Sequence, residues 1–167
     1  MSVVREITEL GNPILRRKAK PIEDVFDVKI LRLAEDMMET LHFAHGVGIA
    51  APQVGESVRL FIVAPDPKVA PVVVINPKIV DHSKTKTKGW EGCLSIPGIR
   101  GLVPRFKSIV VEFTDLQGGL VVVEAKDFVA RVFQHENDHL DGIIFLDRLE
   151  NTKDIITDRE YSKLFED

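Results

Sequence analysis

Two histidines four positions apart, His135 and His139, constrain the fold more than any other feature of this sequence. Residues at that spacing lie on one face of an α-helix, one turn apart, so both imidazoles converge only if the segment is helical. The surrounding residues favour a helix from about Asp127, the predicted N-cap, to Asp141, with Gly142 ending it. We therefore expect a late helix whose two imidazoles point the same way.

The rest of the chain predicts one early helix and several strands. Apolar residues recur at three and four positions from about Asp24 to His45, the pattern of an amphipathic helix. Short β-branched runs at Val58–Ala64 and Val72–Ile75 predict buried strands, and Ile109–Phe113 with Leu120–Val123 predict a hairpin. The sequence thus predicts an α+β fold of mostly antiparallel strands packed around the late helix, with one long early helix.

Length and composition indicate one compact domain over residues 1–167, because 44% hydrophobic and 29% charged residues are typical of globular proteins. A net charge of −4 gives no global attraction to nucleic acid, so DNA is not an expected partner. A single cysteine favours a reducing compartment, and we expect a cytoplasmic protein. The absence of a signal peptide and of any membrane-length apolar run predicts no membrane association.

The late helix also carries the chemistry of a metal-dependent hydrolase. Glu136 lies between the histidines, about 100° around the helix from His135, where it can flank water without being a ligand. Phe128 and Val132 continue the histidine face and predict an apolar floor. The alternative, two buried histidines with purely structural roles, explains the glutamate poorly.

A catalytic metal site needs a third protein ligand and one open position, and the sequence leaves two candidates. Glu160 follows the motif at a separation used by some zinc endopeptidases, whereas Phe145 occupies the position of the third histidine of another peptidase class. Cys93, the single cysteine, offers a thiolate, a strong ligand for zinc and ferrous iron. A lone cysteine is more often a small buried hydrophobe, so residue type alone does not decide.

Three motifs in order resemble the signatures of peptide deformylases: Gly46-Val-Gly-Ile-Ala-Ala-Pro-Gln53, Glu91-Gly-Cys-Leu-Ser95 and Gln134-His-Glu-Asn-Asp-His-Leu-Asp-Gly142. The resemblance extends over nearly the whole chain. It implies removal of the formyl group from N-formyl-methionyl nascent polypeptides, with release of formate. Two alternatives remain: an endopeptidase that uses Glu160, and a metal-stabilised binding module without catalysis.

The resemblance also assigns roles to residues of this chain. It implies that the metal ligands are Cys93, His135 and His139. It implies that the remaining site residues are Glu136 as general acid/base, the Gln53 side chain and the Leu94 backbone N–H at the reacting carbonyl oxygen, and Gly48 beside the substrate backbone.

The cofactor and the partners follow from the same resemblance. It implies one divalent metal ion, Fe(II) in the cell, which zinc, nickel or cobalt can replace. The expected partners are N-formyl-Met nascent peptides and the ribosome near its exit tunnel. Arg131 is expected at the rim of the side-chain pocket, and an ion pair is expected between Glu91 and Arg100.

Overall fold

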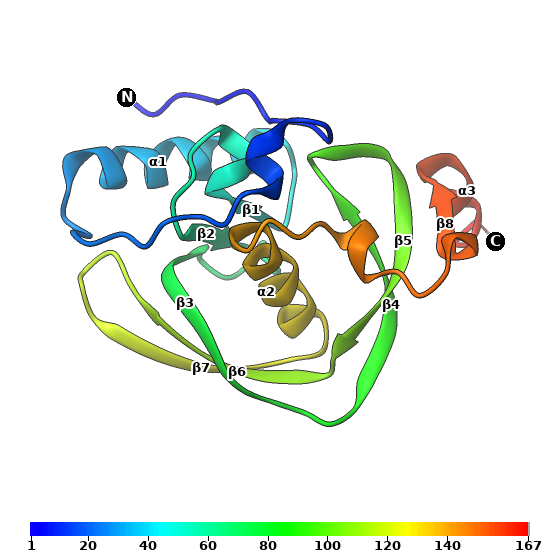
Figure 1. The fold of residues 1–167 in the computed structure, drawn as a ribbon. Coiled ribbons are helices and arrows are strands. Elements are labelled where there is room, and N and C mark those ends of the chain that lie inside the picture. The colour runs from blue at the N-terminus through cyan, green and yellow to red at the C-terminus, as the bar shows by residue number, and fades with distance from the viewer. Residues whose placement is uncertain (167) are drawn as a thin grey trace.

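Two antiparallel sheets form the framework of the computed structural model, which describes residues 1–166 (Figure 1). The larger sheet has the order β1-β2-β3-β6-β7 and comprises β1 (Gly48–Ala50), β2 (Leu60–Val63), β3 (Val72–His82), β6 (Ser108–Thr114) and β7 (Leu120–Lys126). The smaller sheet has the order β4-β5-β8 and comprises β4 (Lys86–Cys93), β5 (Ile96–Phe106) and β8 (Ile155–Thr157).

The helices lie against these sheets. The α-helices are α1 (Val28–Phe43), α2 (Asp127–Leu140) and α3 (Asp158–Lys163), and single 3-10 turns occupy Pro13–Arg16, Ala51–Val54, Phe145–Arg148 and Thr152–Asp154. In Figure 1, α2 lies at the centre of the molecule, with strands of both sheets around it. The predicted α+β class, with antiparallel strands around the late helix, is confirmed. Within residues 1–166, no helix combines the length and apolar character needed to cross a membrane.

The continuous apolar run of β2 has a structural cause, because helices cover both faces of this strand. Phe61 and Val63 pack into one core cluster with residues of α2, whereas Leu60 and Ile62 pack into a second cluster with residues of α1. Alternate residues of a strand point to opposite faces, so a strand covered on both sides needs apolar residues throughout. The same packing fixes α2 against the larger sheet.

The early helix is shorter than its sequence pattern predicts. The Asp24 carboxylate accepts a hydrogen bond from the Phe26 N–H at 2.9 Å, which forms a turn instead of helix. The helix begins at Val28 because Asp27 caps it, accepting from the Lys29 N–H at 2.8 Å.

The start of α2 corrects the prediction that Asp127 is the N-cap. Lys126 is the N-cap residue. Asp127 is the first residue of the helix, and its φ is 50°. The Asp127 N–H donates to the Lys107 carbonyl at 2.8 Å as the chain leaves β7, and aspartate is among the residues that tolerate this left-handed conformation. At the other end Gly142 is required, because its φ is 72° and a Cβ there would lie 2.6 Å from the Arg16 carbonyl oxygen.

The β4–β5 hairpin is the main element that the sequence pattern does not predict. Pro97, Gly98, Gly101 and Pro104 interrupt the apolar alternation of β5, so no strand signal is visible. The alternating lysines and threonines at 84–88 run into β4, which is an edge strand of its sheet, and lysines at such an edge discourage pairing with another chain.

A buried carboxylate anchors the N-terminal segment to α1. Asp36 is 2% exposed and accepts hydrogen bonds from the Val3 N–H at 2.9 Å and from Arg5 Nε at 3.0 Å. Burial raises the pKa of Asp36, but these hydrogen bonds and the charges of Arg5 and Arg32 outweigh it and hold the pKa below its usual range. The carboxylate therefore stabilises the folded state while it is ionised.

We predict that Asp36→Asn lowers the free energy of unfolding at pH 7 by about 1–3 kcal/mol, because charged hydrogen bonds are lost. Because the pKa of Asp36 is lower in the folded state, its carboxylate stabilises the fold at pH values above the unfolded-state pKa of about 3.9. This contribution disappears as the pH falls through the folded-state pKa. The difference from wild type should therefore shrink below about pH 4 in urea unfolding measurements. Glu35→Gln, at the exposed neighbouring position, is the control. A difference that stays constant down to pH 3 would contradict this account.

Candidate metal centre

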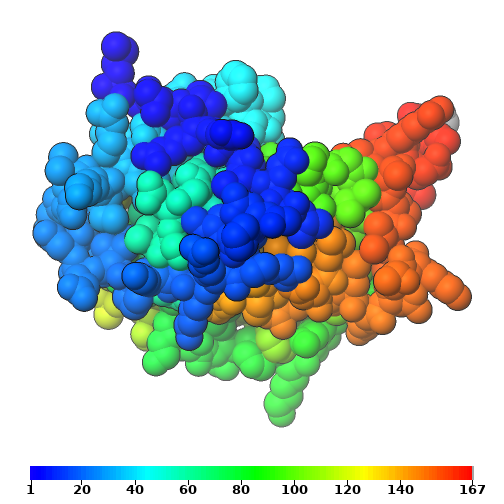
Figure 2. Space-filling model, turned by 45° about the horizontal axis from the view of Figure 1, so that its top comes forward, coloured from blue at the N-terminus to red at the C-terminus, as the bar shows by residue number. Residues whose placement is uncertain are grey.

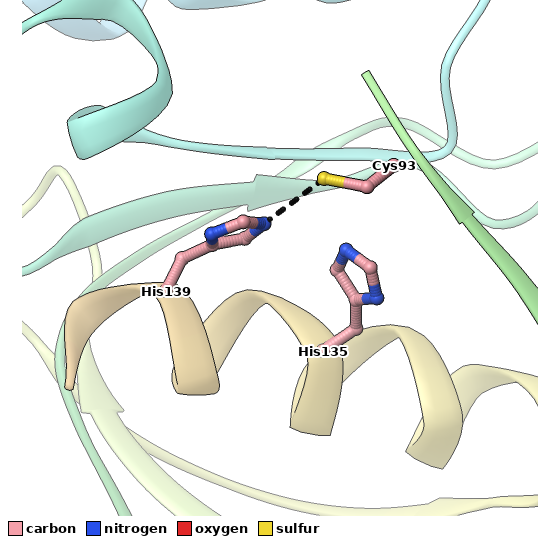
Figure 3. A group of neighbouring side chains, drawn as sticks. All are labelled: Cys93, His135 and His139. Atoms are coloured by element: carbon pink, nitrogen blue, oxygen red, sulfur yellow. Dashed lines mark hydrogen bonds between the residues drawn. The ribbon is translucent and has the colours of Figure 1, made fainter. Parts of the chain in front are cut away.

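The Cys93 thiol and the two imidazoles of α2 meet at one point (Figure 3). Cys93 lies at the end of β4, and its Sγ is 3.3 Å from His139 Nε2. The candidate ligand atoms of Cys93, His135 and His139 all lie within 4.8 Å of one another. Ordinary zinc–sulfur and zinc–nitrogen bond lengths in a tetrahedron separate such atoms by about 3.4–3.6 Å. The donor set therefore fits one divalent ion with small side-chain adjustments.

A carboxylate behind His135 fixes the orientation of its ring. His135 Nδ1 lies 2.8 Å from Glu91 Oε1. Burial raises the pKa of Glu91, but hydrogen bonds from His135 and Arg105 outweigh this and hold the pKa far below its usual range. The ionised carboxylate accepts the Nδ1 hydrogen, which leaves Nε2 of His135 for the site. Metal-binding histidines are commonly held by a carboxylate in this way.

Glu136 places a carboxylate with an unused oxygen beside this cluster. The residue is 4% exposed, and its Oε2 has no hydrogen-bond partner among the described residues. Burial raises the pKa of Glu136 to about 7. A Cβ at Gly48 would lie 2.5 Å from Glu136 Oε1, so only glycine at that position lets β1 approach the carboxylate this closely.

Gln53 is held with its amide nitrogen toward Cys93 and Ser95. Its Oε1 accepts from the Ala50 N–H at 2.9 Å, and its Nε2 donates to Ser95 Oγ at 3.1 Å and to Cys93 Sγ at 3.4 Å. Leu94 follows Cys93 in the turn that joins β4 to β5. The first two sequence motifs thus meet the third in space, although more than 80 positions separate Gln53 from His135.

A cavity of about 610 Å³ opens onto the cluster, a size typical of small-molecule and peptide sites. Gly48, Gln53, Cys93, Leu94, His135 and Glu136 all line it. Val132 forms a buried part of its wall, as predicted. Phe128 also lines the cavity but is 51% exposed, so it lies near the mouth and not at the floor where it was predicted.

Comparison with known proteins identifies the family of this chain. The family model described as polypeptide deformylase matches residues 4–154 of the chain. The chain belongs to the peptide deformylase family.

Individual relatives support the same family. The chain is 53% identical to peptide deformylase 2 of a Nostoc species, over 95% of this chain and 93% of that protein. It is also similar to the crystal structure of a class I type b peptide deformylase from Acinetobacter baumannii with Met-Ala-Ser bound, with a TM-score of 0.85, 40% identity and coverage of 89% and 100%. The peptide deformylase structure from Thermotoga maritima gives the same TM-score and identity, with coverage of 89% and 99%.

Family membership confirms the activity predicted from the three motifs. Peptide deformylases are metal-dependent hydrolases that remove formyl groups from nascent peptides, and this chain is an enzyme of that kind. The endopeptidase alternative loses its support, because Glu160 is exposed, bonds to Lys163 at 2.9 Å and is not part of the cluster.

The prediction of an ion pair between Glu91 and Arg100 is wrong. Arg100 pairs with Asp158, with Nε 2.8 Å from Oδ1. Glu91 instead accepts hydrogen bonds from Nε and Nη2 of Arg105, both at 2.9 Å, and from Nη1 of Arg131 at 2.8 Å. The difference arises because Arg105 lies farther along β5 and is 4% exposed, whereas Arg100 is near the solvent-exposed side.

Arg131 lines the cavity as predicted, and it also binds the β4–β5 hairpin. Its guanidinium donates to the carbonyls of Thr87 and Val103 at 2.7 Å, in addition to Glu91. These partners belong to β4 and β5, so Arg131 fastens α2 to the hairpin.

Sequence patterns also miss a buried charge cluster behind the site. Arg105 contacts both Glu91 and Asp138, and Asp138 also accepts from Arg148 Nη2 at 2.8 Å. Asp138 lies on α2 three residues after His135 and is buried. A carboxylate on a buried helix is itself a signal that a cationic partner exists, although spacing does not identify that partner.

We predict that Arg105→Met lowers the free energy of unfolding by about 3–5 kcal/mol, because it leaves two buried carboxylates without their main partner. Arg148→Met is the matched control, since Arg148 contacts the same Asp138 but is 45% exposed. That change should cost about 1 kcal/mol or less. Equal losses for the two variants in denaturant titrations would refute the role of the buried cluster.

Proposed function

We propose that Cys93, His135 and His139 bind one divalent metal ion and that Glu136 is the general acid/base of deformylation. The observation that supports this most strongly is the convergence of one thiol and two imidazoles beside a buried carboxylate whose Oε2 has no partner among residues 1–166. A divalent ion held there supplies Lewis acidity, which lowers the pKa of water from about 15.7 toward about 7.

Glu136 transfers the proton in this proposed reaction. Its unpartnered oxygen accepts a proton from water and later delivers it to the departing amine, so one carboxylate serves both steps. A pKa raised to about 7 by burial suits both directions of transfer near neutral pH. Gly48 leaves the space that this carboxylate occupies.

Gln53 and Leu94 are proposed to stabilise the negative charge that develops on the formyl oxygen. The support for Gln53 is its fixed amide, whose nitrogen already faces the Cys93 loop. Leu94 contributes its backbone N–H from the turn that follows Cys93. A preorganised donor of this kind is typically worth about 3 kcal/mol of transition-state stabilisation.

The methionine side chain of a formyl peptide is proposed to enter the apolar part of the cavity. Val132 supplies a buried apolar wall, and Arg131, which also lines the cavity, donates to the carbonyls of Thr87 and Val103 and to Glu91. The deformylase from Acinetobacter baumannii was crystallised with Met-Ala-Ser, which agrees with a methionine-first ligand. Gly48, in β1 beside the cavity, is proposed to lie along the substrate backbone.

We propose Fe(II) as the metal in the cell, with zinc, nickel or cobalt able to replace it. Two imidazoles and a thiolate suit all of these ions, and ferrous iron with an open coordination position suits hydrolysis. The test is metal analysis of enzyme purified without exposure to air.

We predict that anaerobically purified enzyme releases formate from formyl-Met-Ala-Ser with one metal ion per chain. Cys93→Ala should lose both metal and activity, because the site loses a ligand. Glu136→Gln should keep its metal but lose more than 100-fold in kcat, since general acid–base catalysis contributes about 10²–10⁴-fold. Glu160→Gln should match wild type. Unchanged turnover by Glu136→Gln would contradict its role as general acid/base, and metal loss by Glu160→Gln would favour the endopeptidase alternative.

We further propose that the enzyme acts in the reducing cytoplasm, close to the ribosomal exit tunnel. A free thiol at the metal site favours a reducing compartment, and nascent chains emerge at that tunnel. With a net charge of −4, attachment is expected through the nascent chain rather than through RNA. The enzyme should therefore sediment with ribosomes that carry a formyl-methionyl chain, and puromycin should release it. Sedimentation that puromycin does not change would contradict this mode of attachment.

A further inference from the structure

The C-terminal segment forms one wall of the cavity. β8 pairs with β5 in the register Ile99↔Thr157, Arg100↔Ile156 and Gly101↔Ile155, and α3 follows directly. Asp158 and Tyr161 of α3 line the same cavity as Cys93 and His135. Figure 2 shows this segment, orange to red, projecting from one side of the molecule. It lies after residue 154, where the match to the family model ends.

Arg100 fastens this segment in place. Its Nε donates to Asp158 at 2.8 Å, and its guanidinium carbon lies 4.4 Å from the centre of the Tyr161 ring. Both contacts hold α3 against β5, beside the cavity. Because Asp158 neutralises Arg100, the wall carries little net charge at this point.

Two aromatic rings are the main feature of this wall. Trp90 lies on β4, three residues before Cys93, and its ring centre is 6.0 Å from that of Tyr161 at an interplanar angle of 73°. Both side chains are half-buried and line the cavity. Phe165 also packs against Tyr161, with ring centres 5.0 Å apart. The part of the Trp90–Tyr161 pair that lines the cavity offers an apolar surface on which another flat or apolar side chain can pack.

We propose that Tyr161 and Trp90 form a subsite for an apolar or aromatic side chain of the substrate downstream of its methionine. This inference rests on the proposed catalytic site, which fixes the formyl group near Cys93. The rest of the peptide must then leave the cavity along one of its walls. A peptide advances about 3.3 Å per residue when extended, so its second to fourth residues are the ones that reach the mouth.

The test is a KM comparison on the metal-loaded enzyme. The substrates are formyl-Met-Ala, formyl-Met-Ala-Ala-Ala and three variants of the longer peptide with phenylalanine at position two, three or four. Wild type should show a lower KM, by about fivefold, for at least one of the phenylalanine peptides. Tyr161→Ala should lose that preference with kcat unchanged, and Tyr161→Phe should keep it.

Formyl-Met-Ala separates this inference from the catalytic assignment. Its single alanine methyl group is too small to pack on Tyr161, so wild type and Tyr161→Ala should process it equally, whereas an error in the catalytic site would remove activity on every substrate. Glu160→Gln, on the same helix, is the control for helix damage. An equal preference for phenylalanine in wild type and Tyr161→Ala, or none in either, would overturn the proposal.

Binding can also be followed directly, because Trp90 is the single tryptophan of the sequence. Titration of the holoenzyme with the formyl-free form of the preferred phenylalanine peptide should change its fluorescence, with a dissociation constant that Tyr161→Ala raises about fivefold. An unchanged spectrum at saturation, with product inhibition confirming occupancy, would place the peptide elsewhere and refute the subsite.

Discussion

The hydrogen bond between Glu91 and His135 connects the chemistry of this enzyme to its fold. Glu91 belongs to β4, in the smaller sheet, whereas His135 belongs to α2, which packs against the larger sheet. Because the same carboxylate also binds Arg105 and Arg131, one buried charge aligns an imidazole and fastens the hairpin to the helix. Buried charges tolerate little displacement without their partners, so the distance from Cys93 to the histidines is fixed by the same contacts.

The sequence predicts best where a residue's own helix or strand determines its position. The i, i+4 histidines converge because helix geometry alone brings them together, and the amphipathic pattern of α1 identifies its buried face. The position of Cys93 cannot be predicted from its own strand. Nothing local relates a residue of β4 to a helix more than 40 positions later, and only the resemblance to deformylases linked them.

Long-range electrostatics and irregular strands account for the errors. Arg100 and Arg105 are both arginines on β5, and the sequence does not say which one turns inward to Glu91. The β4–β5 hairpin is stabilised by its pairing and by α2, not by a regular apolar alternation, so propensity alone misses it. Asp127 illustrates a third cause, since a backbone hydrogen bond to Lys107 shifted the helix cap by one residue.

The doubly covered strand β2 leaves its alignment with its neighbours underdetermined. In a sheet with one solvent-exposed face, a shift of one residue in the strand pairing would expose apolar side chains to water, and this penalty selects the register. Leu60, Phe61, Ile62 and Val63 are all buried, so a slipped β2 would still bury apolar side chains on both faces. Shape must therefore select the alignment, because a slip would exchange Phe61 and Val63, which pack in the cluster with α2, with Leu60 and Ile62, which pack in the cluster with α1. The fit of individual side chains thus takes the role that solvent exposure has in a two-layer sheet.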